Sequence, residues 1–299
     1  MSLQSYVRPR GLDDALAALA DPRTRPLIIA GGTDVIPAMR KMRLGEPQAA
    51  GDDDDRPGVV VDLSQLDELR GIGEKDGMLL IGAATTMGAI ARHELVKDRA
   101  PALAAAAASV GSPLVRNRAT VGGNLATASP SADTAPALLA ANAVLGLASA
   151  RQGRREVSIT DFFVGYRRTL LQPGEIVAYI LLPLSRGLVR GRFEKVGLRN
   201  ADAISMVCVA VEMELDGRVC REARIGLGAV AAVPVRAFAV EAALKDREID
   251  EAVARECAKL VHEHISPIDD LRASARYRSW VAEAVVARMI IDMACKARS

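Results

Sequence analysis

Two glycine-containing segments are the part of this sequence whose residue types and spacing could carry out chemistry. The first has the sequence IAGGTD over residues 29–34 and follows a short apolar run. Adjacent glycines permit positive φ, so consecutive backbone N–H groups can converge on an anion near the positive end of the next helix. Thr33 adds a hydroxyl donor. The segment has neither a GxGxxG pattern nor the GK pair of a P-loop. Its spacing alone leaves an anion site and an ordinary strand-to-helix turn equally open.

The second segment, ATVGGNLATASPSAD over residues 119–133, gathers small and hydroxyl-bearing residues before a helix with Pro136 in its first turn. Such a run cannot form a packed core by itself, and it predicts a thin wall against which a flat ligand lies. Positive φ and close backbone approach are expected at Gly32 and Gly123. Asp133 is placed either to cap the next helix or to accept hydrogen bonds from a ligand polyol. Two such segments make one shared ligand more credible than either segment alone.

The composition excludes several other classes of protein. The chain has 299 residues, a formal net charge of +2 and 3% aromatic residues, so neither the basic face nor the stacking rings of a nucleic-acid-binding protein are expected. The N-terminus does not resemble a signal peptide, and no apolar run reaches the roughly 20 residues of a membrane span. The dispersed cysteines predict reduced thiols and no iron–sulfur cluster; they are Cys208, Cys220, Cys257 and Cys295. We therefore expect a soluble, cytoplasmic protein.

The three histidines lie outside both glycine segments. His93 falls on an expected helix, and His262 and His264 are two residues apart, whereas a metal-binding pair on a helix is four residues apart. No metal site is predicted, and no side chain is predicted to act as a catalytic acid or base.

The elements that must position the first segment alternate between strands and helices. Residues 1–50 are expected to form a strand–helix–strand–helix unit, in which Asp13 or Asp14 caps the first helix and residues 26–30 form the second strand. The run GDDDDRPG over residues 51–58 predicts a solvated linker, because four adjacent carboxylates repel one another.

After this linker the pattern changes. Helices are expected to follow Thr85 or Thr86 and to begin at Pro101, and strands are expected at residues 59–63, 78–81, 144–147, 157–159, 175–182 and 192–198. The turn Asp216-Gly217 between alternating apolar runs predicts a hairpin over residues 206–230. Three further helices are expected at residues 236–244, 249–264 and 273–297.

These elements predict an α+β protein with three parts. A small α/β lobe is expected over residues 1–57, and a larger mixed sheet-and-helix lobe over residues 58–183. An antiparallel sheet with helices is expected to form a C-terminal domain over residues 184–299.

Six segments of the sequence, in order, carry a resemblance to a known family. They are YVRP at residues 6–9, AGGTD at 30–34, RNRATVGGNLATASPSAD at 116–133, FFVGYRRTLLQPGEI at 162–176, FEKVGLRNADAIS at 193–205 and ARIGLGAVAAVPVRA at 223–237. Nearly the whole chain resembles the FAD-binding (medium) subunit of the molybdenum hydroxylases. This family includes carbon monoxide dehydrogenase, 4-hydroxybenzoyl-CoA reductase and the flavin domain of xanthine dehydrogenase.

The resemblance implies a two-lobed FAD-binding domain and assigns residues to the cofactor. Those implied to hold the pyrophosphate, mainly through backbone N–H groups, are Ile29, Ala30, Gly31, Gly32, Thr33, Asp34 and Val35. Those implied to line the pyrophosphate, the ribityl chain or the flavin are Val110, Gly111, Thr120, Gly123, Asn124, Ala126, Thr127 and Asp133. Ile176 and Val177 match apolar positions beside the adenine or the flavin.

Lys195 matches a lysine near the isoalloxazine, where a cation favours the anionic reduced flavin. Its spacing alone instead favours a solvated strand lysine. Some relatives carry an inserted cysteine-rich loop that holds an iron–sulfur cluster, and the four dispersed cysteines place this chain away from them. Because no histidine lies in either glycine segment, FAD is expected to be bound non-covalently.

The function that the resemblance implies is that of an electron-transfer subunit. A separate molybdopterin large subunit would oxidise the substrate, and a small subunit with two 2Fe–2S clusters would pass electrons to FAD on this chain. An external acceptor such as NAD, a quinone or O2 would then receive them. Two alternatives stay open: a free-standing FAD-dependent oxidase or reductase, and a non-catalytic nucleotide-binding scaffold.

Overall fold

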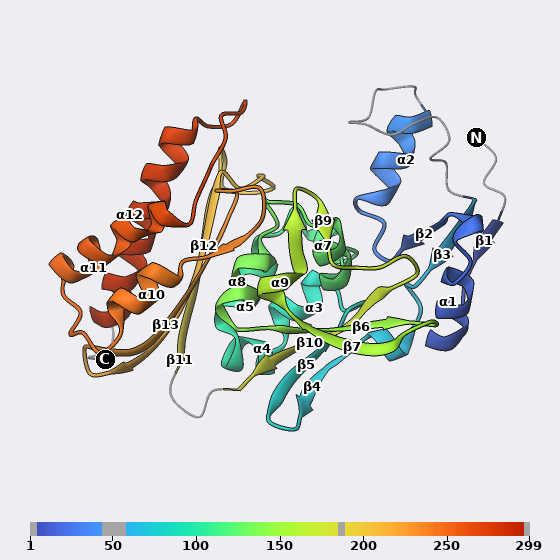
Figure 1. Cartoon of the computed structure of the whole chain (residues 1–299), viewed down its shortest axis with the longest axis horizontal. Helices are drawn as coiled ribbons and strands as arrows, with labels where there is room; N and C mark the ends of the chain where they lie inside the picture. The colour runs from blue at the N-terminus through green and yellow to red at the C-terminus, as the bar shows by residue number, and fades with distance from the viewer. Residues whose placement is uncertain (1–4, 44–57, 185–188, 296–299) are drawn as a thin grey trace.

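The computed structural model describes residues 5–43, 58–184 and 189–295. Figure 1 shows three groups of elements in a row: the blue N-terminal group, the central group from cyan to yellow, and the orange and red C-terminal helices with their sheet. Each group contains its own β-sheet, and the mixture of sheets and helices confirms the predicted α+β class. Nearly all of the expected linker at residues 51–58 lies outside the described residues.

The N-terminal sheet has three parallel strands in the spatial order β1–β3–β2, with bounds Ser5–Val7, Val59–Asp62 and Pro26–Ile29. Because β3 is the central strand, the predicted boundary between residues 57 and 58 separates it from both of its partners. The division into three domains stays a prediction.

Two helices and a short 3₁₀ turn accompany this sheet: α1 (Leu12–Leu19), η1 (Pro22–Thr24) and α2 (Val35–Arg43). Helix α1 buries its leucines against the sheet. The prediction of its cap was wrong, because the residue before the first turn is Gly11. Asp13 and Asp14 lie inside the first turn, where the positive end of the helix dipole stabilises their negative charges.

The central sheet is antiparallel, with the order β4–β5–β10–β6–β7. Its strands are β4 (Ile72–Lys75), β5 (Met78–Gly82), β6 (Val144–Ser149), β7 (Gly153–Ser158) and β10 (Ile176–Pro183). The strand expected at residues 157–159 ends earlier, because the hydroxyl of Ser158 accepts a hydrogen bond from the Thr160 N–H and starts a short helix. A small hairpin, β8 (Phe163–Gly165) and β9 (Arg168–Thr169), follows that helix.

The helices of the central group are short, and several of them begin at a recognisable signal. Thr86 accepts a hydrogen bond from the Ala89 N–H and caps α3, as predicted, and Pro101 begins the alanine-rich α5. The helical elements are η2 (Asp67–Leu69), α3 (Met87–Arg92), α4 (Glu94–Arg99), α5 (Pro101–Ser109), α6 (Pro113–Arg116), α7 (Val121–Thr127), α8 (Thr134–Ala140) and α9 (Ile159–Phe162).

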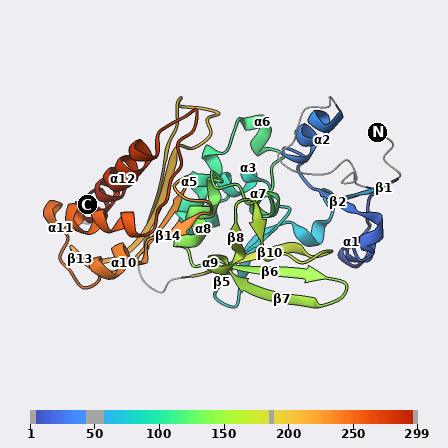
Figure 2. The ribbon, with the colours of Figure 1, turned by 45° about the horizontal axis from the view of Figure 1, so that its top comes forward.

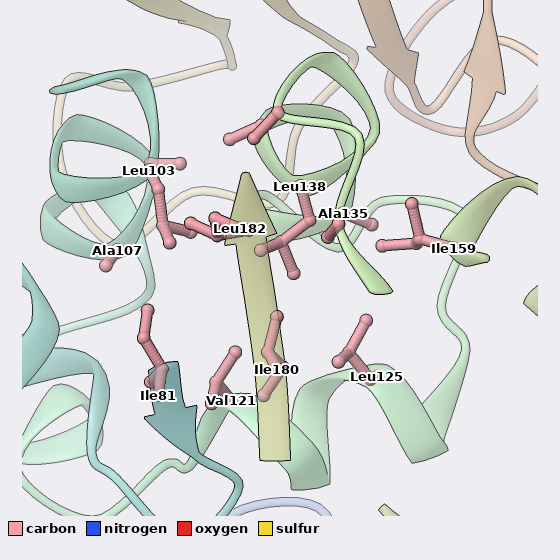
Figure 3. Close-up of a cluster of buried hydrophobic side chains, with 14 of the residues drawn as sticks. Ile81, Leu103, Ala107, Val121, Leu125, Ala135, Leu138, Ile159, Ile180 and Leu182 are labelled. Atoms are coloured by element: carbon pink, nitrogen blue, oxygen red, sulfur yellow. The ribbon is translucent and has the colours of Figure 1, made fainter. Parts of the chain in front are cut away.

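A single apolar core joins these helices to the central sheet. Figure 3 shows side chains of α5, α7 and α8 meeting those of β5 and β10. The labelled residues include Leu103 of α5, Leu125 of α7, Leu138 of α8 and Ile180 of β10, and all four are buried. Because α7 belongs to the second glycine segment, this core fixes where that segment lies.

The C-terminal sheet is antiparallel, with strands β11 (Val189–Val196), β12 (Val207–Asp216), β13 (Val219–Gly228) and β14 (Val235–Arg236) in that order. The predicted hairpin is confirmed: β12 pairs with β13 across the Asp216-Gly217 turn. The helical elements that follow are α10 (Phe238–Leu244), α11 (Glu251–Ala258), η3 (Lys259–Glu263) and α12 (Ala275–Cys295).

Both faces of this sheet are covered. The C-terminal helices pack on one face, and α5 and α8 of the central group pack on the other (Figure 2). Successive residues of a strand point to opposite faces. Val209 and Val211 accordingly join the core beneath the C-terminal helices, whereas Ala210 between them joins the central core. The C-terminal sheet is therefore a shared layer that holds two groups of elements together.

Candidate functional site

A cavity of about 1130 Å³ is lined by residues of all three groups. Ligand cavities are typically about 300–1,000 Å³, so this one has room for a dinucleotide-sized molecule. Both glycine segments line it. A third side is formed by lining residues of the C-terminal group at 202–204, 229–232, 266–272 and 278, which we call the C-terminal wall.

The first glycine segment turns the chain sharply from β2 into α2. Gly32 has a φ of +74°, which an L side chain rarely adopts. A Cβ on Gly31 would lie 2.0 Å from the carbonyl oxygen of Arg118, so only glycine fits there. No described residue accepts a hydrogen bond from the backbone N–H groups of residues 31–35. These donors line the cavity at the N-terminus of α2, an arrangement that favours an anion.

The second glycine segment uses its glycines differently. Gly123 lies in helix α7 without a positive φ, so the expectation of a positive φ at that residue was wrong. Its N–H donates to the hydroxyl of Thr120 (3.2 Å), and the Gly122 N–H donates to the Ala83 carbonyl oxygen (2.8 Å). The N–H groups of this glycine pair are therefore satisfied within the protein. The segment instead presents small side chains to the cavity, so a ligand can approach its backbone closely.

The two segments are joined directly across the cavity. The hydroxyl of Thr127 donates to Oδ2 of Asp34 over 3.1 Å. Ninety-three positions separate these residues in the sequence, and both line the cavity. The prediction that the segments face one ligand-sized space is consistent with this contact.

Asp133 belongs to a buried network instead of capping α8. Its side chain makes no cap hydrogen bond. Instead Oδ2 accepts from Lys195 Nζ (2.6 Å) and Oδ1 accepts from Ser205 Oγ (2.5 Å). Burial raises the pKa of Asp133, and the charge and hydrogen bond of Lys195 oppose that shift. Lys195 also donates to the Ser109 carbonyl oxygen (3.1 Å), so the network joins β11, α5 and the second glycine segment.

Sixteen of the predicted site residues line the cavity, and two do not. Ile29 is replaced in the lining by Ile28, because alternate side chains of β2 point to opposite faces. Lys195 does not line the cavity, and with 13% of its side chain exposed it is not a solvated strand lysine either. Those that line it are Ala30, Gly31, Gly32, Thr33, Asp34, Val35, Val110, Gly111, Thr120, Gly123, Asn124, Ala126, Thr127, Asp133, Ile176 and Val177.

Sequence reasoning missed two features of the cavity. One is Arg116, whose Nη1 donates to the carbonyl oxygens of Val110 (3.0 Å) and Gly111 (2.8 Å) and so holds that part of the lining. The other is the C-terminal wall. Residues 266–272 have no local pattern that predicts a ligand site. The signals for the rest of the wall were the motifs at 193–205 and 223–237, which contain its first two stretches, and Arg278, a charged residue on the otherwise apolar face of α12.

Two of the three histidines make ordinary structural contacts, whereas Nδ1 of His93 is buried without a hydrogen-bond partner among the described residues. His262 Nε2 lies 2.8 Å from Glu283 Oε2, and His264 Nε2 accepts a hydrogen bond from the Ala239 N–H (2.9 Å). The described part of the chain contains no cluster of three or more potential metal ligands. Within the same residues, we find no helix with the length and apolarity that a bilayer span requires.

Comparison with known proteins identifies the family. Residues 1–185 match the family model of the FAD binding domain in molybdopterin dehydrogenase, and residues 192–293 match that of the CO dehydrogenase flavoprotein C-terminal domain. The chain belongs to this family. The resemblance seen in the sequence is therefore confirmed, and the chain is a FAD-binding subunit of the molybdopterin-dependent oxidoreductases.

Full-length relatives support this assignment. The chain is 31% identical to the glyceraldehyde dehydrogenase medium chain of Sulfolobus acidocaldarius, over 97% of this chain and 98% of the relative. It is 32% identical to the xanthine dehydrogenase FAD-binding subunit of Escherichia coli, over 96% and 95%. Its fold matches quinoline 2-oxidoreductase from Pseudomonas putida 86 with a TM-score of 0.89 and 30% identity, over 100% of this chain and 99% of the other.

Proposed function

We propose that the cavity holds FAD non-covalently, with the pyrophosphate at the first glycine segment. The observation that carries this proposal is the row of N–H groups at residues 31–35, which have no acceptor among the described residues and belong to residues on the cavity wall at the start of α2. A dinucleotide pyrophosphate is the anion that such donors suit. The size of the cavity and the absence of side chains at Gly31 and Gly32 are also consistent with FAD.

Other residues would surround the rest of the cofactor. Val110, Gly111, Ile176 and Val177 offer backbone and apolar surface to the ring systems. Asn124 is held in place because its Oδ1 accepts from the hydroxyl of Thr134 (2.6 Å). When bound, FAD supplies redox chemistry in steps of one or two electrons. The protein binds, orients and shields the cofactor, and none of its side chains is proposed to act as a catalytic acid or base.

We further propose that this chain works in a heteromeric complex. A small subunit with 2Fe–2S clusters would deliver electrons that a molybdopterin large subunit takes from the substrate, and NAD, a quinone or O2 would accept them. Two relatives are named as a medium chain and a FAD-binding subunit, which supports a multi-subunit enzyme. Exposed apolar side chains also adjoin the cavity: Ile204 is 54% and Ile268 is 71% exposed, and both line it.

Reconstitution with FAD tests the first proposal. We expect the purified chain to bind FAD with a dissociation constant below about 1 μM, and 100-fold excess over that constant to add about 2.7 kcal/mol of stability. The bound chromophore should bleach with dithionite and recover in air. A chain that neither retains FAD nor gains thermal stability from it would refute the proposal. A chromophore-free ligand bound at the same site would favour the scaffold alternative.

Co-expression with candidate partners tests the second proposal. We expect the chain to co-purify with an iron–sulfur subunit and a molybdopterin subunit, and its flavin to be reduced by substrate only in that complex. A chain that stays alone and turns over a substrate by itself would instead be a free-standing oxidase or reductase.

A further inference from the structure

Arg278 is a buried charge in the C-terminal wall. It stands in the first turn of α12 and is 3% exposed. Nη1 donates to the carbonyl oxygens of Met206 (2.6 Å) and Ala229 (3.0 Å), and Nη2 donates to Oδ1 of Asp270 (2.8 Å). Its Nε is buried with no partner among the described residues. An arginine with one unsatisfied donor is a poor choice for stability alone, which points to a role at the cavity that this residue lines.

The three acceptors of Arg278 belong to three separate segments. Met206 follows the lining residues 202–204, Ala229 begins the stretch 229–232, and Asp270 lies within 266–272. A hydrogen bond from the Ser266 N–H to the Val230 carbonyl oxygen (2.9 Å) also joins the last two stretches. One guanidinium thus links the three other segments of the C-terminal wall to α12.

Ala229 connects this wall to the second glycine segment. Its N–H donates to the carbonyl oxygen of Pro130 (2.7 Å), a residue that also lines the cavity. Its φ is +63°, a conformation that a residue other than glycine keeps only where its surroundings impose it. Here the Ala229 N–H donates to Pro130 and the Ala229 carbonyl oxygen accepts from Arg278, and these two hydrogen bonds hold the backbone in that conformation.

Asp270 shares its carboxylate between the guanidinium and its own loop. Oδ1 also accepts from the N–H groups of Arg272 (2.8 Å) and Ala273 (3.1 Å). The position of Arg278 and the conformation of residues 266–272 therefore depend on the same oxygen atom.

We propose that Arg278 is a positioning residue of the FAD site, which fixes the C-terminal wall so that α12 and the second glycine segment hold the cofactor together. This inference rests on the proposed function. The planar guanidinium reaches two carbonyl oxygens and a carboxylate in different directions, which a lysine ammonium on a flexible stem does not reproduce.

The test compares Arg278→Met with a matched control, Arg224→Met. Arg224 is also a largely buried arginine of the C-terminal group, bonded to Ala140, Glu212 and Glu222, but it does not line the cavity. We expect the dissociation constant for FAD to rise at least tenfold in Arg278→Met and to change less than about twofold in Arg224→Met. The visible circular dichroism of bound FAD should change only in Arg278→Met.

Two further variants keep the proposal falsifiable if Arg278→Met does not fold. Arg278→Lys should bind FAD nearly as weakly as the Met variant, and Asp270→Asn should weaken binding about threefold. Wild-type affinity and dichroism in both would overturn the proposal, as would equal losses in Arg224→Met and Arg278→Met. If the wild-type chain itself binds no FAD, the proposed function fails. If the wild-type chain binds FAD and the Arg278 variants bind it equally well, this inference alone fails.

Discussion

The two glycine segments look alike in the sequence but differ in the structure. In the first, the N–H groups of the Gly31-Gly32 pair have no acceptor among the described residues, and the missing side chain of Gly31 lets the turn pass against Arg118. In the second, the N–H groups of Gly122 and Gly123 bond to the protein itself. We infer that the first segment binds the anion and that the second acts mainly as a wall.

The difference shows that a glycine pair can have more than one structural role. A glycine whose backbone N–H stays free can bind a ligand through that N–H. A glycine inside a helix instead contributes by letting neighbouring groups pack closely against the backbone. The open donors of the first pair follow from its place between the end of β2 and the start of α2. The second pair lies within α7, where the capping threonine and neighbouring carbonyl oxygens take up its donors.

The largest expected effect on FAD binding separates the two glycine pairs directly. Gly31→Ala should weaken FAD binding at least about 100-fold, roughly 2.7 kcal/mol, because its Cβ would lie 2.0 Å from a backbone oxygen. Gly123→Ala places its Cβ 2.9 Å from the movable hydroxyl of Thr120 and should weaken binding less than about fivefold. Fluorescence titration with FAD measures both, and far-UV circular dichroism verifies folding. Equal losses in the two variants would contradict the comparison.

The next effect tests whether Asp133 serves the protein or the ligand. Removing one partner of a buried ion pair costs about 3–5 kcal/mol, and Asp133 and Lys195 form such a pair. Asp133→Ala and Lys195→Met should therefore lower the free energy of unfolding by similar amounts in urea titrations. An additional loss of FAD affinity confined to Asp133→Ala would show that this carboxylate also contacts the cofactor.

A smaller effect is expected at the cap of α7. Thr120→Val removes the acceptor of the Gly123 N–H and should reduce stability by about 0.5–2 kcal/mol. If the second segment is a wall, FAD affinity should fall no more than about threefold once the protein is folded. Thermal unfolding and FAD titration of the same sample provide the measurement. A tenfold loss of affinity without a loss of stability would place Thr120 at the pyrophosphate.

The smallest effect concerns pH and the C-terminal wall. Burial raises the pKa of Asp270, but the N–H groups of Arg272 and Ala273 and the Arg278 guanidinium outweigh it and bring the pKa to about 2, below the usual 3.8. A depressed pKa adds stability above the unfolded value and loses it as pH falls from about 4 to about 2. The stability difference between wild type and Asp270→Asn should shrink in that range and stay constant above about pH 5. A constant difference throughout would contradict this.

Much of the framework could be predicted from the sequence because it depends on local signals. The Asp216-Gly217 hairpin, the cap at Thr86 and the helix that begins at Pro101 each follow from a few neighbouring residues. The motifs that resemble the family also located most of the cavity lining. These signals survive in the structure because local preference and packing agree.

The parts that could not be predicted depend on contacts between distant residues. Asp133 was expected to cap a helix or to bind a ligand because only its own segment was visible, whereas Lys195 of β11 and Ser205 of the following loop approach it from the C-terminal group. The central place of β3 depends on pairing with strands on both sides. The C-terminal wall is joined to the rest of the cavity by contacts between distant residues, such as the hydrogen bond from the Ala229 N–H to the Pro130 carbonyl oxygen, so residues 266–272 gave no sign of it.

The path of the chain around the cavity has a consequence for biosynthesis. The turn that we propose to bind the anion ends at Val35, whereas the side chain that bonds to the segments of the C-terminal wall is Arg278. At translation rates of about 5–20 residues per second, the ribosome adds Arg278 roughly 10–50 seconds after that turn. In the nascent chain, the turn is therefore present long before the far wall of the cavity can form around a cofactor. We expect the yellow holoprotein to form late, after nearly all of this sequence has been translated.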